Sequence, residues 1–476
     1  MHACLKIQNI LHWTGAACLL VLAGCCAPKN SWTNPNSGRW QDAGNWSSGS
    51  PSNRVSIFIT NPGTKTVTID DTTTSGKFSD TLSINDLTVA GTAGFSNTLA
   101  MVGAGTTEPL QVADSVALGT GGGPGFLIVS NSALDAGALI LGSHNGSVGV
   151  MTVLSNAIVN VNSNITLSSL SLTATSTITL NGGYFTATNG LTQIGVTGNG
   201  VLTVTGGTNT FRQIILNPNG TGSGGFHMHG GKVKILGNGT GPGQGLVSNW
   251  VLFDGGDLDG SATSLTIGMN TDDSEVTIQE GPSGLQGQLA AMYVGYGTNT
   301  GTFTEAGFNS CEVDVSNLVV LGDSISGAIG NVNLSGGRLC ITNPMQSAAL
   351  IIRNGTVNLS GDGNGNGGDL MVDNIYLTNS TGRFVTNGGS LHVNGKIFTL
   401  RPPLSATRSP GMVTISWSAM TPWPAWGLQT NSDLTKPNGW TADGIPPTFN
   451  GDTYSVSVTP KATKLFFRLI LIVPTL

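Results

Sequence analysis

The sequence predicts an all-β protein: a right-handed parallel β-helix followed by a small C-terminal β-sandwich-like module. Composition is the first observation behind this prediction. Charged residues make up 9% of the 476-residue chain and glycine accounts for 70 positions, whereas ordinary globular proteins have about 25% charged residues and about 7% glycine. Short runs of Val, Ile, Leu and Thr are broken by Gly, Asn and Ser, which is typical of strands joined by tight turns.

A repeated turn pair is the second observation. A Gly-Gly or Ser-Asn pair follows a short strand at 130, 155, 182, 206, 230 and 255, and again near 306, 336, 360 and 388. A unit of about 25 residues cannot bury its apolar face alone, but stacked units can. We therefore expect residues 96–400 to form a solenoid whose coils lie about 4.8 Å apart.

The third observation is that no unit contains the helical pattern that a βαβ crossover needs. The main alternative fold is an all-β sandwich or a propeller. A propeller blade needs roughly 40–45 residues, which is longer than the spacing of the turn pairs, so the repeat favours the β-helix.

Residues 1–24 have the features of a signal peptide. Lys6 precedes an apolar run at 16–24 that is shorter than the roughly 20 residues needed to span a membrane. The run ends in "LAGC", which resembles the bacterial lipobox and implies that Cys25 becomes the lipid-bearing N-terminus. Cys26 follows Cys25, at the position where an aspartate would signal retention in the inner membrane. The resemblance therefore implies that the protein is located in the outer membrane. The alternative is an ordinary cleaved secretory signal and a secreted protein.

Residues 25–95 are expected to form an N-terminal cap and the first strands. Three tryptophans, Trp32, Trp40 and Trp46, lie close together and would cover the first apolar layer of a solenoid. The alternative is that they form a platform on which a carbohydrate stacks.

The tryptophan segment resembles that of secreted bacterial proteins with autotransporter-associated β-strand repeats. The resemblance implies a parallel β-helix, and it is carried by Trp32, Gly38, Trp40, Asn45, Trp46, Gly49 and Pro51.

Beyond the solenoid, the proline-rich segment 401–410 is predicted to be a linker and 411–476 a small β domain. Its short strands resemble a C-terminal module of similar bacterial surface proteins, through residues 414–417, 428–434 and 466–469. Two cysteines remain outside the N-terminal region, Cys311 and Cys340. They form either a disulfide between neighbouring coils, which export would permit, or two separate buried thiols.

The stretch "DGNGNGGDLMVD" matches part of a calcium-loop register. The predicted ligands are the side chains of Asp362, Asn364, Asn366 and Asp373 and the carbonyl of Gly368, because Ca²⁺ prefers oxygen ligands at alternating loop positions. Calcium is the only cofactor that the sequence suggests. The alternative is a glycine-rich corner between two coils.

Two further groups of polar side chains have residue types that occur in catalytic or metal sites. Asp257 and Asp259 share one strand face by the two-residue period, with Asp254 close by; acid–base catalysis needs such clustered carboxylates. His227 and His229 also share a face, but a metal site needs a third ligand. A polar, solvated surface explains both groups, so no catalytic residue is assigned.

The functional prediction is a surface-anchored structural or adhesive lipoprotein without catalytic activity, attached to the membrane through its lipid. The alternative is a protein that binds or cleaves an extracellular polysaccharide. A net charge of −6 argues against a nucleic-acid partner. Three or more carboxylates or basic side chains converging on one face would favour the enzyme, whereas scattered charges would favour the scaffold.

Overall fold

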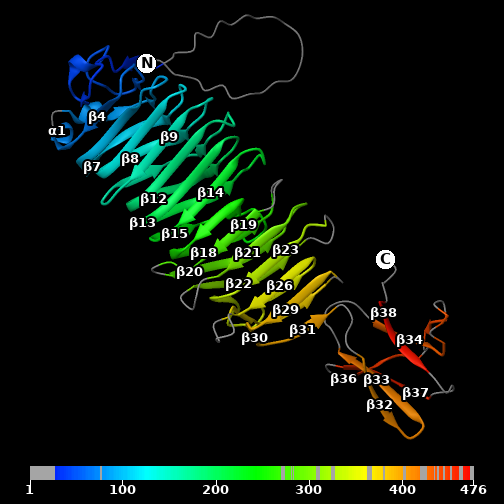
Figure 1. Ribbon diagram of the computed structural model, residues 1–476. Coiled ribbons are helices and arrows are strands. Elements are labelled where there is room, and N and C mark those ends of the chain that lie inside the picture. Colours follow the sequence, from blue (N-terminus) through cyan, green and yellow to red (C-terminus); the bar gives the residue numbers. More distant parts are fainter. Residues whose placement is uncertain are drawn as a thin grey trace, which may run out of the picture.

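The computed structural model describes residues 27–471 apart from 76–77, 270–273, 280, 282–283, 307–310, 323–326, 362–366, 379–380, 400–403, 419–425, 434, 437–438, 443–444, 451–452 and 460–464. It shows a long rod of stacked strands and a separate small module at the C-terminal end (Figure 1). One sheet of 31 strands makes up the rod, and its pairings are parallel. The predicted β-solenoid is therefore confirmed, with about 13 turns.

Each coil contributes strand segments to three parallel faces, which we call A, B and C in chain order. Face A contains β2 (Gly38–Arg39), β4 (Lys65–Ile69), β9 (Val148–Val153), β14 (Ser223–Met228), β17 (Trp250–Phe253), β19 (Ser274–Ile278), β21 (Gly301–Glu305), β23 (Gly330–Leu334), β26 (Gly355–Ser360) and β29 (Gly382–Asn387). Face B contains β5 (Ser83–Ile84), β10 (Ile158–Val161), β15 (Lys232–Ile235), β24 (Arg338–Ile341), β27 (Asp369–Val372) and β30 (Ser390–Val393).

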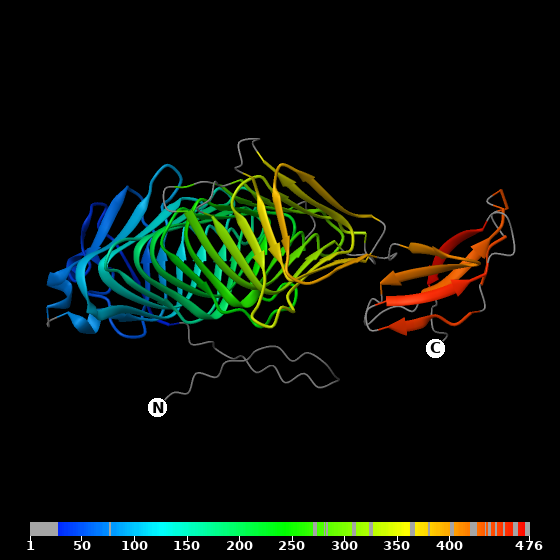
Figure 2. The same ribbon diagram turned by 90° about the horizontal axis from the view of Figure 1, so that it is seen from below.

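Face C closes each coil. It contains β1 (Lys29–Ser31), β3 (Ser56–Ile59), β6 (Leu87–Val89), β11 (Ile165–Leu167), β16 (Leu246–Ser248), β25 (Ala349–Ile352), β28 (Asn374–Leu377) and β31 (Ile397–Thr399). Long strands continue around the corners: β7 (Asn97–Leu118), β8 (Pro124–Leu141), β12 (Thr175–Ile194) and β13 (Asn199–Leu216) through all three faces, and β18 (Gly255–Ile267), β20 (Gly284–Val294) and β22 (Glu312–Leu321) through faces B and C. Figure 2 shows these strands wrapped around the rod.

The repeated turn pair forms the corner between faces A and B. The second residue of successive pairs has a positive φ, as at Asn156 (57°), Gly183 (67°), Gly207 (80°) and Gly231 (77°). This backbone conformation favours Gly and Asn. A Cβ at Gly207 would lie 2.6 Å from the carbonyl oxygen of Gly183 in the coil before. Glycine therefore lets the corners of adjacent coils stack directly.

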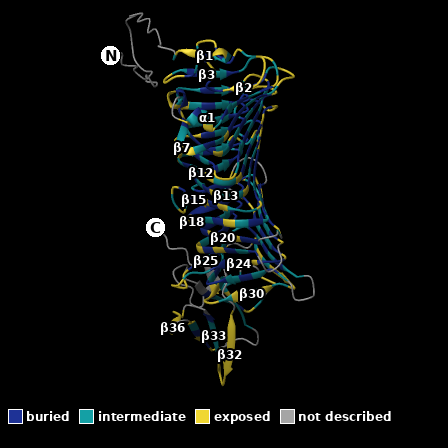
Figure 3. Ribbon diagram, turned by 90° about the vertical axis from the view of Figure 1, so that its left-hand side faces the viewer, coloured by how far each residue is buried: buried dark blue, intermediate teal, exposed yellow. Residues whose placement is uncertain are grey.

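Apolar columns fill the inside of the rod. On face A one column runs through Val204, Met228, Phe253 and Ile278, and all four side chains are buried. Period-two alternation sends every second residue inward, which produces the buried stripe in Figure 3. Each coil thus covers the apolar side of its neighbours, as the repeat predicts.

The N-terminal tryptophans form a cap. Trp32, Trp40 and Trp46 are buried, and the rings of Trp32 and Trp40 each meet Trp46 edge to face, with centroids 5.0 and 5.2 Å apart. The short helix α1 (Asp71–Thr74) and the 3-10 turns η1 (Ala43–Asn45) and η2 (Ser79–Leu82) lie in the same region. Because the rings are inside, they are not a platform for stacking a carbohydrate.

The C-terminal module consists of two antiparallel sheets. Strands β32 (Ser405–Ser409), β33 (Met412–Ser418), β37 (Thr453–Val458) and β36 (Thr448–Asn450) form one sheet, and β35 (Thr441–Ala442), β34 (Trp426–Asn431) and β38 (Phe466–Leu471) form the other. A small core with Ile415, Trp417, Leu428 and Val456 lies in this module.

The start of the module differs from the expectation. β32 lies inside the predicted linker 401–410 and pairs with β33 in an antiparallel hairpin. The strand falls between the prolines of that segment, so its own backbone N–H groups remain available for pairing. Among the described residues, no helix is long and apolar enough to cross a membrane.

Candidate functional site

Polar side chains on the outside of face B stack in two columns along the rod. From the middle coils onward, each strand presents two outward residues separated by one buried residue. The first column runs through Lys232, Asp257, Gln286, Glu312, Arg338, Asp369 and Ser390, and the second through Lys234, Asp259, Gln288, Asp314, Cys340, Met371 and His392. We call these two columns the charged face.

Strand alternation fixes the direction of these side chains. The residues between the two columns, among them Val233, Leu258, Val313 and Leu339, are buried in the solenoid core. Residues on either side must therefore point outward. The register then places the outward residues of consecutive coils directly next to one another, about 4.8 Å apart.

Ion pairs join the first two rungs of the charged face. The Lys232 ammonium lies 3.2 Å from Asp257 Oδ2, and the Lys234 ammonium lies 2.8 Å from Asp259 Oδ2. The hydrogen bond from Lys234, with others from Ser261, lowers the pKa of Asp259. These pairs are solvent-exposed, so each contributes about 0–1 kcal/mol to stability; their main effect is to arrange the side chains.

A second group of charges centres on Arg338. Its Nε lies 3.1 Å from Asp369 Oδ2, and one terminal nitrogen lies 3.9 Å from Glu312 Oε1. His392 Nε2 approaches the other oxygen of Asp369 at 3.5 Å. The hydrogen bond to Asp369 raises the pKa of Arg338. One arginine thus links carboxylates from two neighbouring coils.

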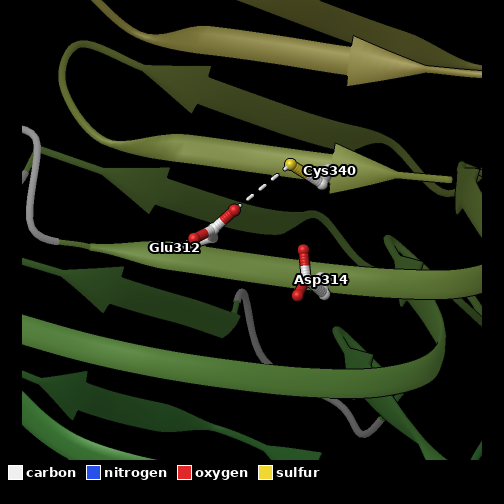
Figure 4. Close-up of side chains that lie close together, drawn as sticks. All are labelled: Glu312, Asp314 and Cys340. Atoms are coloured by element: carbon white, nitrogen blue, oxygen red, sulfur yellow. Dashed lines mark hydrogen bonds between the residues drawn. The ribbon is translucent and has the colours of Figure 1, made fainter.

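Glu312, Asp314 and Cys340 form the tightest cluster of potential metal ligands among the described residues (Figure 4). One ligand atom from each lies within 4.8 Å of the others, and the Cys340 thiol donates to Glu312 Oε1 over 3.7 Å. Burial, together with Asp314 and Glu312, raises the pKa of Cys340 to about 12. The thiol is therefore protonated at neutral pH, whereas the thiolate is the form that binds metal ions.

The carboxyl of Asp314 also has a perturbed pKa. Its tip is exposed, but the neighbouring strands withdraw enough water to raise the pKa, and the charge of Glu312 adds to this effect. A carboxyl of raised pKa beside a second carboxylate is an arrangement that acid–base catalysts use. Glu312 and Asp314 therefore form the most chemically distinctive pair on this face.

A third carboxyl lies inside the rod at the end of β21. Glu305 is fully buried and occupies the face A column between Ile278 and Leu334. Its Oε1 accepts a hydrogen bond from the backbone N–H of Arg338 at 3.1 Å, and Oε2 has no partner among the described residues. Burial raises its pKa to about 8, so the side chain is mostly neutral at pH 7.

The predicted calcium ligands fall into two groups. Asp362, Asn364 and Asn366 lie outside the described residues. Asp373 is buried and already engaged: Oδ2 accepts from the backbone N–H groups of Asn343 (3.0 Å) and Ala348 (3.2 Å). The Gly368 carbonyl accepts from Ser390 N at 2.9 Å in the ladder between coils. The calcium loop stays a prediction, but two of its five ligands already have structural roles.

Cys311 and Cys340 each carry a thiol rather than half of a disulfide. Cys311 is in the hydrophobic core, on the inward side with Val313, whereas Cys340 pairs with Asp314 in the outward column. The two side chains lie on opposite sides of the sheet. The disulfide alternative is therefore not present, and the structure has the two buried thiols.

The histidine pair lies on face A and at its corner with face B. His229 Nδ1 is 2.7 Å from Asp254, while the His227 ring packs at right angles to Trp250 with centroids 4.4 Å apart. Burial, and then the neighbouring His229, lower the pKa of His227, partly offset by Asp254. The two imidazoles have different partners and do not converge on a shared metal position. Asp254 is likewise separated from Asp257 and Asp259 by the corner.

The sequence reasoning identified Asp257 and Asp259 but missed Glu312, Asp314, Arg338 and Asp369. The missing signal is the position after the turn pair: "GGKVK", "GGDLD", "GGRLC" and "GGDLM" each carry a charged residue directly after Gly-Gly. Aligning the repeats by that pair would have placed Arg338 and Asp369 in one column with Lys232 and Asp257. Glu312 and Asp314 follow "FNSC" instead, so this pair does not align them.

Eight acidic and basic side chains converge on the outside of face B. Fold and site together define a parallel β-solenoid that carries a mixed-charge face. Comparison with models of known families, with curated proteins and with solved structures finds no significant match.

Proposed function

We propose that this protein is a surface-anchored adhesive β-solenoid that binds an extracellular polysaccharide along its charged face. The alignment of outward polar side chains in two columns over consecutive coils is the observation that carries this proposal. Stacked rungs about 4.8 Å apart offer an extended chain of sugar residues a repeated set of hydrogen-bonding groups.

The ion pairs of the charged face favour a neutral polysaccharide over an acidic one as the ligand. Lys232, Lys234 and Arg338 each have a carboxylate partner, so no cation of these columns is left to hold a uronic acid. Carboxylates accept hydrogen bonds from hydroxyl groups, whereas amides both accept and donate them. The bonds that involve a charged group are the stronger ones. The charged face therefore suits a hydroxyl-rich, uncharged ligand.

The double variant Asp257→Asn/Glu312→Gln tests this role of the charged face. We expect it to bind neutral hexasaccharides such as cellohexaose or mannohexaose at least about tenfold more weakly than the unmodified chain, since two charge-assisted hydrogen bonds are lost. Isothermal titration with the mature chain is the measurement. The control Asp42→Asn/Asp71→Asn removes two exposed carboxylates away from the charged face, and we expect no change. Equal binding by both variants would contradict the proposal, and so would stronger binding of oligogalacturonate.

Cleavage of the polysaccharide is the second candidate function, and Glu312 with Asp314 is the observation that favours it. Asp314 carries a carboxyl of raised pKa directly beside the Glu312 carboxylate, and carboxyl pairs of this kind serve as acid and base in catalysis. Incubation of the same hexasaccharides with the mature chain distinguishes the two functions. Shorter products that disappear in Glu312→Gln would support cleavage, whereas an unchanged ligand supports adhesion alone.

Attachment to the outer membrane through Cys25 is part of the proposal, and the lipobox-like "LAGC" supports it. Full-length protein expressed in a Gram-negative host is expected to fractionate with membranes and to incorporate labelled fatty acid. Several buried acyl chains, at about 0.8 kcal/mol per CH₂, anchor a protein stably. Cys25→Ser should abolish both properties, whereas Cys26→Ser should keep them. Labelling of Cys25→Ser would show that Cys25 is not the anchor.

A further inference from the structure

We infer that Trp250, on face A, forms a second contact for the sugar ring of a neutral polysaccharide. Trp250 is the first residue of β17, and its side chain points outward with 45% of the residue exposed. This inference rests on the proposed polysaccharide binding and adds a specific subsite outside the charged face.

The neighbouring positions show how unusual this tryptophan is. The same outward column of face A contains Thr177 and Val201 before it and Glu275 and Thr302 after it. Trp250 is thus a large aromatic side chain in a column whose other members named here are small or polar. It has the flat apolar surface and the N–H donor that make tryptophan common in binding sites.

The indole is held in one orientation by the coil before it. Gly225 precedes Trp250 in the column, and a Cβ at Gly225 would lie 3.3 Å from Trp250 Cε3 and 3.6 Å from Cζ3. Glycine therefore lets the ring lie close to the sheet. The His227 ring stands next to it at 86°, with ring centroids 4.4 Å apart. A preorganised ring loses less entropy when a ligand binds.

The surroundings of the indole suit an uncharged ligand with hydroxyl groups. His227 is neutral at pH 7, because burial and His229 lower its pKa. Glu275 lies in the next rung, and its carboxylate already holds the Thr277 hydroxyl at 3.1 Å. An aromatic plane beside one carboxylate and one hydroxyl matches a pyranose, whose C–H face is apolar and whose edge carries hydroxyls.

Titration of cellohexaose and mannohexaose into the mature chain tests this subsite. We expect Trp250→Ala to weaken the binding of at least one of them by about five- to tenfold and Trp250→Phe to retain most of it. Gly225→Ala keeps the indole but displaces it, and we expect a loss between these two. Phe95→Ala removes another exposed aromatic residue, 44% exposed, and should bind as the unmodified chain does.

The outcomes separate this inference from the proposed function. If the unmodified chain binds neither hexasaccharide, the proposed function fails and the subsite fails with it. If the unmodified chain binds and Trp250→Ala binds equally well, only the subsite is overturned. A dimer in light scattering that Trp250→Ala converts to a monomer would also overturn the subsite, by assigning Trp250 to self-association.

Discussion

Replacing Glu305 with leucine is expected to stabilise the solenoid, and the gain should grow as the pH rises from 5 to 9. Glu305 occupies a column position that Ile278 and Leu334 fill in the adjacent coils, and its Oε2 is buried without a partner among the described residues. Leucine removes the buried polar atoms. It also removes the free-energy cost that the carboxyl adds to folding, either by taking up a proton or by being ionised inside the rod.

The sign of the pH dependence follows from the pKa. Burial raises the pKa of Glu305 from an ordinary 4.5 to about 8, so the folded state binds a proton that the unfolded state releases. Stability is therefore lost as the pH rises from about 4.5 to about 8, and the full loss above that range is on the order of 3–5 kcal/mol. Below pH 4.5 both states are protonated and this cost disappears.

Urea unfolding at pH 5, 7 and 9 measures the effect. Glu305→Gln is the matched control, because it stays uncharged but remains polar: we expect it to lose the pH dependence and to gain less stability than Glu305→Leu. Gly337 leaves room for the Glu305 side chain, since a Cβ at Gly337 would overlap Oε1, so the shorter leucine fits. A pH profile that is the same in all three proteins would show that Glu305 does not ionise within the fold.

Trp40→Ala is expected to be the most damaging single change in the cap. The Trp40 side chain is fully buried, its indole N–H donates to the Thr81 carbonyl at 3.1 Å, and its ring packs on Trp46. Truncating a buried tryptophan costs about 3–5 kcal/mol. In a solenoid each coil depends on its neighbours, so the loss should fall on the first coils.

Limited proteolysis and thermal unfolding monitor that loss. We expect faster cleavage within residues 30–95 of Trp40→Ala and little change in the rest of the rod. Trp250→Ala removes an exposed tryptophan instead and should unfold as the unmodified chain does. If Trp40→Ala unfolds no earlier than Trp250→Ala, the three tryptophans are not a cap.

The repeat was readable in the sequence because its physical cause is local. The positive φ at corners between faces A and B favours Gly or Asn, as at Asn156 and Gly183, and the alternation between corners shows which residues point inward. The cap was predictable for the same reason, since Trp32, Trp40 and Trp46 lie close together in the chain.

The charged face was harder to predict because it depends on register between coils of unequal length. Asp314 pairs with Cys340 and Cys340 with Met371, so one coil is longer than the other by several residues. A uniform repeat places neither Arg338 next to Asp369 nor Cys311 on the opposite side of the sheet from Cys340. The role of Asp373 likewise depends on a contact with the 343–348 segment of the preceding coil.

The charged face depends on the register that stacks the outward residues of face B, and engineered disulfides test this register most directly. Thr186 and Thr210 are direct partners in adjacent coils, and Lys234 is the next residue in the same column. In a chain with Cys25 and Cys26 replaced by serine, we expect Thr186→Cys/Thr210→Cys to form a disulfide on mild oxidation. Thr186→Cys/Lys234→Cys should not, because two rungs separate those Cα atoms by about 9–10 Å, beyond the roughly 7 Å that a disulfide can span. Cross-linking of the second pair but not of the first would contradict the stacking and, with it, the charged face.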